Sequence, residues 1–195
     1  MTSSATFFLI SPANLSGKRG QLLFDPQAKV QVGARLRSPA GAPLGEVFSF
    51  VSGLYFRGKM AYAERFGQAP EGLGAARVMT AGGGLCTLGE PVTLARLEAW
   101  RQVIVSENNP HFTAPLVRHV CELADSLGPD ARFVLLGSVA SHKYVAPLHE
   151  ALGPRLLFPT KLAGLGDMSR GSLLLRAVRD GVELDYAPVR TARSL

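Results

Sequence analysis

The fold is decided by residues 132–159, RFVLLGSVASHKYVAPLHEALGPRLLFP. Residues 132–136 form an apolar run of strand length that ends at a Gly-Ser pair. A helix is expected to follow as far as Leu152, where a Gly-Pro pair stops it. Residues 155–158 then form a second apolar run. This order of strand, helix and strand predicts a right-handed crossover between parallel strands.

The same alternation extends toward both ends of the chain. After a glycine-containing loop, a further helix is expected from Asp167 or Ser169 to Arg179. Upstream, the patterns predict strands at 6–10, 29–36 and 77–80, and helices at 54–66, 93–100 and 114–126. There is no internal repeat and no long linker. We therefore expect an α/β fold, as a single three-layer domain over residues 1–195 with a mostly parallel or mixed central sheet.

Composition excludes several classes of protein. Of the 195 residues, 47% are hydrophobic and 18% are charged, which excludes a disordered chain. The two cysteines and four histidines show no metal-ligand spacing, so we expect no metal and no other cofactor. No apolar run approaches the ~20 residues that a membrane-spanning helix needs. The first six residues lack the basic start and apolar segment of a signal peptide, so a cytoplasmic protein with no membrane partner is expected.

Positive charge is concentrated near the start of the chain. The net charge is +6, and residues 1–60 hold seven Lys or Arg residues but only two Asp or Glu residues. Such a block favours an anionic partner, which could be a nucleic acid, a nucleotide or a membrane surface. The alternative is a basic composition with no specific partner.

The loop at residues 11–20 follows the first predicted strand, and ligands of α/β folds meet the loops at the carboxyl ends of strands. Ser11, Asn14, Lys18 and Arg19 provide a hydroxyl, an amide and two cations beside glycine, which suits a phosphate or a carboxylate. Neither a Walker motif nor a GxGxxG fingerprint is present. The alternative is a solvated basic loop.

A glycine run follows the predicted strand at 77–80. Gly82, Gly83 and Gly84 would let a ligand approach the backbone closely. Cys86 lies just beyond them and would be a nucleophile only if a neighbouring base lowered its pKa. No such partner is evident in the sequence, so a small buried thiol is the favoured interpretation.

Two later loops carry candidate catalytic residues. Ser138 and His142 lie at a strand-to-helix turn and could form a nucleophile pair, although GxSxG is absent. The favoured alternative makes Ser138 or Ser141 a helix N-cap. In the loop after residue 159, Asp167 is the best carboxylate for acid–base work or for holding a sugar hydroxyl, unless it only caps a helix. That loop also supplies two cations, Lys161 and Arg170.

The predicted helix at residues 54–66 interleaves aromatic and basic side chains. Tyr55 and Tyr62 are seven residues apart and share a face, whereas Arg57 and Lys59 lie off that face. Aromatic stacking combined with cations is typical of proteins that hold single-stranded nucleic acid or a splayed base. The alternative is a pair of buried tyrosines beneath a basic outer face.

Four segments resemble the YaaA-like peroxide-stress family and its short relatives of unknown function. The segments FLISPA at 8–13, LYFRG at 54–58, VMTAGGGL at 78–85 and PTKLAGLG at 159–166 are similar to the family's LISPAK, Y-x-G, ILSAxxGL and PLxGLGxG segments. Asn14 stands where the family has lysine, and only Gly-Glu-Pro at 89–91 echoes its acidic-Pro-Tyr segment. These departures leave a carried-over catalytic role open.

The resemblance implies a compact α/β protein with a basic cleft that binds DNA, and it connects the chain with stress response. Some relatives belong to systems that modify deazapurine bases in DNA, which would imply base-directed hydrolysis or transfer. In this hypothesis Lys18, Arg19, Arg57 and Lys59 hold phosphates, while Tyr55 or Tyr62 stacks on a base that the glycine run admits.

Two other hypotheses belong to different classes. One is a nucleotide or nucleoside hydrolase or transferase whose pocket is lined by Ser138, His142, Lys161 and Asp167; the other is an interaction module without catalysis. Basic residues gathered around one pocket would indicate a small ligand, and a long basic stripe would indicate a polymer. Catalysis and oligomeric state stay open at this point.

Overall fold

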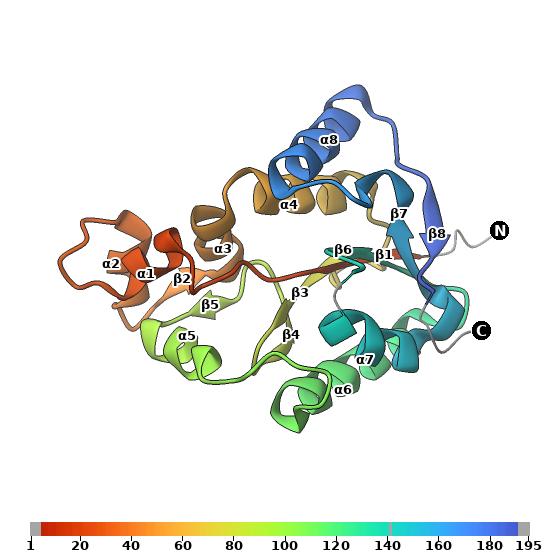
Figure 1. Cartoon of the computed structure of the whole chain (residues 1–195). Coiled ribbons are helices and arrows are strands. Elements are labelled where there is room, and N and C mark those ends of the chain that lie inside the picture. Colours follow the sequence, from red (N-terminus) through yellow and green to blue (C-terminus); the bar gives the residue numbers. More distant parts are fainter. Residues whose placement is uncertain (1–4, 141, 191–195) are drawn as a thin grey trace.

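A computed structural model describes residues 5–140 and 142–190, which form a six-stranded sheet in the order β4-β3-β1-β6-β7-β8 (Figure 1). The strands are β1 (Thr6–Ile10), β3 (Ala76–Thr80), β4 (Gly84–Cys86), β6 (Arg132–Leu136), β7 (Leu156–Pro159) and β8 (Tyr186–Pro188). The four inner strands are parallel, and the two edge strands run antiparallel to their neighbours. The expected α/β class with a mixed, mostly parallel sheet is confirmed.

Helices cover both faces of this sheet. They are α1 (Lys18–Phe24), α2 (Gln31–Leu36), α3 (Leu44–Ser52), α4 (Leu54–Phe66), α5 (Leu94–Arg101), α6 (Pro110–Leu127), α7 (His142–Leu152) and α8 (Asp167–Asp180). The short 3-10 helices η1 (Gly153–Arg155) and η2 (Thr160–Leu162) flank β7, and β2 (Ala42–Pro43) pairs with β5 (Pro91–Val92). Helices α4 and α8 lie on one face and α6 and α7 on the other (Figure 1).

The central strand β1 is buried on both faces, as its unbroken apolar sequence predicts. Phe8 and Ile10 belong to the core cluster beneath α4 and α8, whereas Phe7 and Leu9 belong to the cluster beneath α6 and α7. All four side chains are fully buried. Burial of each contributes roughly 1.5–3 kcal/mol to the free energy of folding, so this strand anchors both halves of the core.

Local signals placed most elements correctly. The predicted helix at 54–66 coincides with α4, and the strands at 6–10 and 132–136 coincide with β1 and β6. Thr93 caps α5 by accepting a hydrogen bond from the Arg96 amide at 3.3 Å.

The strand predicted at 29–36 is wrong, because this segment contains the helix α2. Val32 and Leu36 are four residues apart, so they share a helix face and are both buried. The Arg37 guanidinium then donates to the carbonyls of Gly33, Leu23 and Asp25 at 2.8, 3.0 and 2.9 Å. These contacts join α2 to the end of α1, and no alternation of apolar residues could reveal them.

The order of the strands creates a crevice at the carboxyl ends of β1 and β6. The chain leaves β1 for β3 on one side and later returns to β6 on the other side. At such a point the loops diverge and open a ligand site. Gly137 lets the two loops approach closely there, because a Cβ atom on it would lie 2.9 Å from the Ser11 Cβ atom.

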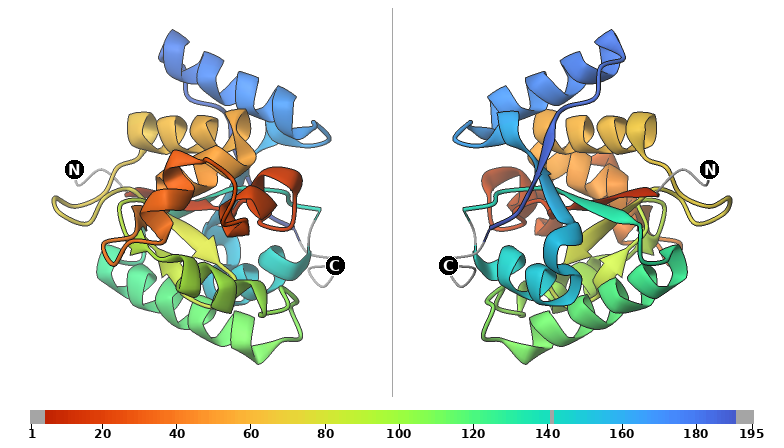
Figure 2. Two further views of the ribbon diagram at one scale, coloured as in Figure 1. Left: turned by 90° about the vertical axis from the view of Figure 1, so that its left-hand side faces the viewer. Right: turned by 90° about the vertical axis from the view of Figure 1, so that its right-hand side faces the viewer.

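Helices α4 and α8 lie side by side (Figure 2), and they pack against each other through glycine. A Cβ atom at Gly171 would lie 2.9 Å from the Tyr55 backbone, and one at Gly58 would lie 3.0 Å from the Gly171 carbonyl oxygen. Close backbone contact therefore requires both glycines. Their contact brings Tyr55 and Lys59 of α4 next to the first turns of α8. Of the helices in the described ranges, none has the length and apolar character needed to cross a membrane.

Candidate functional site

A cleft of about 800 Å³ lies at the carboxyl ends of β1 and β6. Small-molecule sites commonly have volumes of about 300–1,000 Å³. The loop after β1 and helix α1 supply residues 11–20 of its lining. The other lining residues come from α3 (Phe48, Val51, Ser52), α4 (Tyr55, Lys59), the β3 loop (Ala81), α5 and its following loop (Trp100, Arg101, Val103, Val105), the β6 loop (Ser138), α7 (Lys143, Tyr144) and α8 (Asp167, Arg170).

Positive charge dominates this lining. Six basic residues face a single carboxylate, that of Asp167; they are Lys18, Arg19, Lys59, Arg101, Lys143 and Arg170. The Arg170 guanidinium lies 3.8 Å from the Asp167 carboxylate, so even this negative charge is partly compensated. A concave surface with one dominant sign of charge concentrates ligands of the opposite sign. The cleft is therefore suited to an anion.

Lys59 is the most deeply buried of these cations, with 1% of its surface exposed. Its Nζ atom donates hydrogen bonds to the Ser11 carbonyl oxygen at 2.7 Å and to Ser11 Oγ at 3.0 Å. It also lies 4.6 Å from the centre of the Tyr55 ring. Burial lowers the pKa of Lys59 to about 7, against a smaller opposing effect of Asp167 and with a further lowering by Arg170.

Tyr55 carries a buried polar atom at the same place. Its hydroxyl makes no hydrogen bond of normal geometry with a described residue, although Arg170 lies near enough to influence its pKa. Burial is the largest effect and raises the pKa of Tyr55. Leaving a buried polar atom unpaired costs about 1–3 kcal/mol, so a ligand that bonds to this hydroxyl would recover that free energy.

The structure brings together most of the residues singled out in the sequence. Those that line the cleft are Ser11, Asn14, Lys18, Arg19, Tyr55, Lys59, Ser138, Asp167 and Arg170. Arg57, Lys161 and His142 are exposed and lie outside the lining. Ser138 and His142 are thus not brought together at the cleft. Ser141, the alternative helix cap, lies outside the described residues.

The glycine run has a different role from the one expected. A Cβ atom would lie 3.1 Å from the Trp100 ring at Gly82 and 2.9 Å from it at Gly83. At Gly84 a Cβ atom would lie 2.6 Å from the Pro115 carbonyl oxygen. The three glycines therefore admit neighbouring parts of the protein, and none of them lines the cleft.

The cleft side chains that were not singled out beforehand as binding residues include Trp100, Arg101, Lys143 and Tyr144. Lys143 and Tyr144 directly follow His142 at the start of α7, so the cleft is lined by the two residues after the histidine that the sequence suggested. Trp100 and Arg101 end a helix on the far side of the cleft. Only the folded chain places them there.

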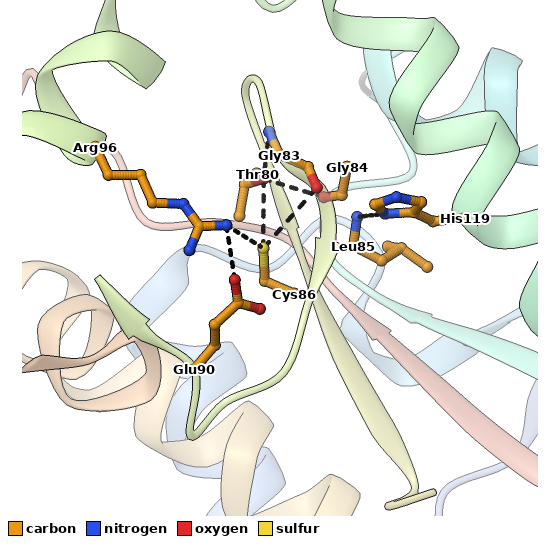
Figure 3. A network of polar contacts seen from close by, with 8 residues as sticks. All are labelled: Thr80, Gly83, Gly84, Leu85, Cys86, Glu90, Arg96 and His119. Carbon is orange, nitrogen blue, oxygen red and sulfur yellow. Dashed lines mark hydrogen bonds and ion pairs between the residues drawn. The ribbon is translucent and has the colours of Figure 1, made fainter. Parts of the chain in front are cut away.

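Cys86 takes part in a separate polar network (Figure 3). Its Sγ atom lies 4.0 Å from Thr80 Oγ1 and 3.9 Å from an Arg96 nitrogen, and Arg96 pairs with Glu90 at 2.6 Å. Burial is the main cause that raises the pKa of Cys86 to about 11, and the Glu90 charge raises it further. The thiol therefore stays protonated at neutral pH, and the interpretation of Cys86 as a buried thiol is confirmed.

Comparison with protein-family models, curated proteins and solved structures gave no match to this chain. The resemblance to the YaaA-like family consequently stays a prediction. Within the described part of the chain, no group of three or more His, Cys, Asp or Glu side chains gathers as a metal site would require.

Proposed function

We propose that the protein binds a nucleotide or a closely related phosphate-bearing small molecule in the cleft. The observation that carries the proposal is the convergence of five cations, the buried amine of Lys59 and one carboxylate on a single cleft of about 800 Å³. Guanidinium and ammonium groups form charge-assisted hydrogen bonds with phosphate oxygens. Lys18 and Arg19, both exposed on the first turn of α1, are assigned to this contact.

The rest of the lining provides for the uncharged parts of a nucleotide. Tyr55, Trp100 and Tyr144 place three aromatic side chains around the cleft, and aromatic rings stack on nucleobases. Asp167 is assigned to a sugar hydroxyl, for which a carboxylate is a good acceptor. The chemical class that fits this set of groups is a nucleotide or nucleoside hydrolase or transferase.

The cations of the first sixty residues favour a small ligand over a polymer. Three of the seven, Lys18, Arg19 and Lys59, line the cleft. Arg35 pairs with Glu46 at 2.6 Å, and Arg37 is held by backbone carbonyls. Binding of DNA, as the YaaA-like resemblance implies, is the second proposal, because one nucleotide of a nucleic acid would present the same phosphate and base to the cleft.

Intrinsic fluorescence offers a direct test, because the only tryptophan of the chain, Trp100, lines the cleft. We expect nucleoside mono-, di- and triphosphates to change this fluorescence in a saturable way. The double variant K18E/R19E should weaken binding on the order of 100-fold, since two charge-assisted hydrogen bonds are lost.

The matched control is R57E/K161E, which changes the net charge equally at two exposed residues outside the cleft lining. It should retain the wild-type affinity. Equal losses of nucleotide affinity in the two double variants would show that the net charge of the protein, and not the cleft, governs binding. Absence of binding for every nucleotide would refute the proposed function.

A further inference from the structure

Ser11 and Lys59 form an enclosed polar pair at the base of the cleft. Four buried side chains in the described ranges are polar or charged and not aromatic, namely Thr6, Ser11, Lys59 and Thr80, and only Ser11 and Lys59 of these line the cleft. The Lys59 Nζ atom lies 3.0 Å from Ser11 Oγ. This distance is within the reach that a general base needs to remove a proton from a nucleophile.

Lys59 is also oriented by a third group. The Ser11 carbonyl oxygen accepts a hydrogen bond from Nζ at 2.7 Å, and the rings of Tyr55 and Phe56 lie 4.6 and 4.9 Å from Nζ. A neutral amine has N–H donors for the carbonyl oxygen and a lone pair that can accept the Ser11 hydroxyl proton. The charged ammonium donates to Ser11 Oγ at 3.0 Å, and the neutral amine can accept the hydroxyl proton over the same distance.

The surroundings of Lys59 favour the neutral form of its amine, which is the form that can act as a base. The charged groups that face it are Asp167 and Arg170, both from α8, while Tyr55 and Phe56 of its own helix are uncharged at neutral pH. Within the described part of the chain, no carboxylate forms an ion pair with Nζ. Burial lowers the pKa of Lys59 to about 7, so a large fraction of the molecules carry the neutral amine at neutral pH.

We propose that Ser11 is a nucleophile and Lys59 its general base, in the hydrolysis of a carboxylic ester carried by a phosphate-bearing molecule. Serine with lysine as base recurs as a variant of the acyl-transfer triad. The acyl-transfer chemistry rests on this pair. The phosphate-bearing part of the substrate rests on the proposed function of the cleft.

The reaction proceeds in two balanced steps. Lys59 takes the Ser11 hydroxyl proton as Oγ attacks the ester carbonyl carbon, and the carbonyl electron pair moves to its oxygen. When the tetrahedral intermediate collapses, the bond to the alcohol oxygen breaks and Lys59 returns the proton to that oxygen. Water then attacks the acyl-serine, giving its proton to Lys59, which returns it to Ser11 Oγ as the carboxylic acid leaves. The cationic lining favours the negative charge of both tetrahedral intermediates.

A neutral alkyl fluorophosphonate probe tests this pair in the full chain. Ser11 Oγ would displace fluoride and form a stable phosphonyl adduct, which peptide mass spectrometry locates. We expect the adduct on Ser11 and not on Ser52 or Ser138, which also line the cleft. S11A should abolish labelling, whereas S172A, at an exposed position of α8, should label at the wild-type rate.

The rate of labelling should rise with pH, with its midpoint near 7, because only the neutral amine accepts the proton. K59M should label about 100-fold or more slowly and lose this pH dependence. Because Lys59 is buried, the pH profile of the wild-type protein keeps the proposal testable even if K59M fails to fold. No Ser11 adduct between pH 6 and 9, or a rate without pH dependence, would overturn it.

The double variant K18E/R19E separates this proposal from the nucleotide site, because it should lose nucleotide affinity yet label at Ser11. Nucleotide binding without labelling would refute the Ser11–Lys59 pair alone. Labelling without nucleotide binding would refute the proposed ligand class alone.

Discussion

Replacing Lys59 with methionine should change the free energy of unfolding by an amount that depends on pH. In the folded protein, burial lowers the pKa of Lys59 from 10.5 to about 7. Between these values the unfolded chain holds a proton that the folded chain has released. Stability therefore rises with pH across this window, and below pH 7 the cost of burying Lys59 is fully present.

The size of the effect follows from the two pKa values. The cost of burying the amine is about 4 kcal/mol at pH 7 and about 2 kcal/mol at pH 9. Methionine has no charge to bury, so the stability of K59M relative to the wild type should fall by about 2 kcal/mol from pH 7 to pH 9.

Urea denaturation of both proteins at pH 7, 8 and 9 measures this difference. Titration of all other groups cancels when the two proteins are compared at each pH. A difference that stays constant within about 0.5 kcal/mol would refute the account of Lys59 as a lysine with a pKa near neutrality.

Three further predictions concern the framework of the site. G171A should destabilise the protein by about 1–3 kcal/mol, because its Cβ atom would lie 2.9 Å from the Tyr55 backbone, whereas G89A, with open space around it, should not; thermal unfolding measures both. R37A should lower the free energy of unfolding by about 1–3 kcal/mol, because the Arg37 hydrogen bonds to three carbonyls are lost. R35A removes only an exposed ion pair and should lower it by at most about 1 kcal/mol; chemical denaturation measures both. N-ethylmaleimide at pH 7.5 should modify the exposed Cys121 and spare Cys86, whose pKa is raised to about 11; faster modification of Cys86, detected by mass spectrometry, would contradict its burial in the network of Figure 3.

The sequence predicted best those elements whose local residue pattern agrees with their place in the fold. The apolar runs of β1 and β6 and the caps of α5 are local features, so they could be identified without the fold. The segment at 29–36 misled because two of its alternating apolar residues, Val32 and Leu36, are four apart and so also share one helix face. The Arg37 contacts with Leu23 and Asp25 join residues 14 and 12 positions apart, which a local pattern does not contain.

The candidate site was predictable as a set of loops but not as an arrangement of atoms. Ser11 and Lys59 are 48 residues apart and were both singled out, yet only as phosphate contacts. Their pairing depends on how α4 lies against the end of β1, which local patterns do not contain. The glycine run was misassigned for the same reason, since the Trp100 ring that fills the space beside it comes from another helix.

Competition between a labelled nucleotide and nucleic acid distinguishes a cleft that takes a small phosphate-bearing ligand from one that takes a polymer. Fluorescence anisotropy would follow a labelled nucleotide, and single- and double-stranded DNA and RNA, over a series of salt concentrations. We expect the nucleotide to bind and unlabelled nucleotide to displace it. K18E/R19E should weaken this binding on the order of 100-fold, and R57E/K161E should not change it. Tight binding of DNA or RNA that no free nucleotide displaces, with a log affinity falling by ~0.7–0.9 per phosphate contact against log salt, would contradict the small-ligand proposal.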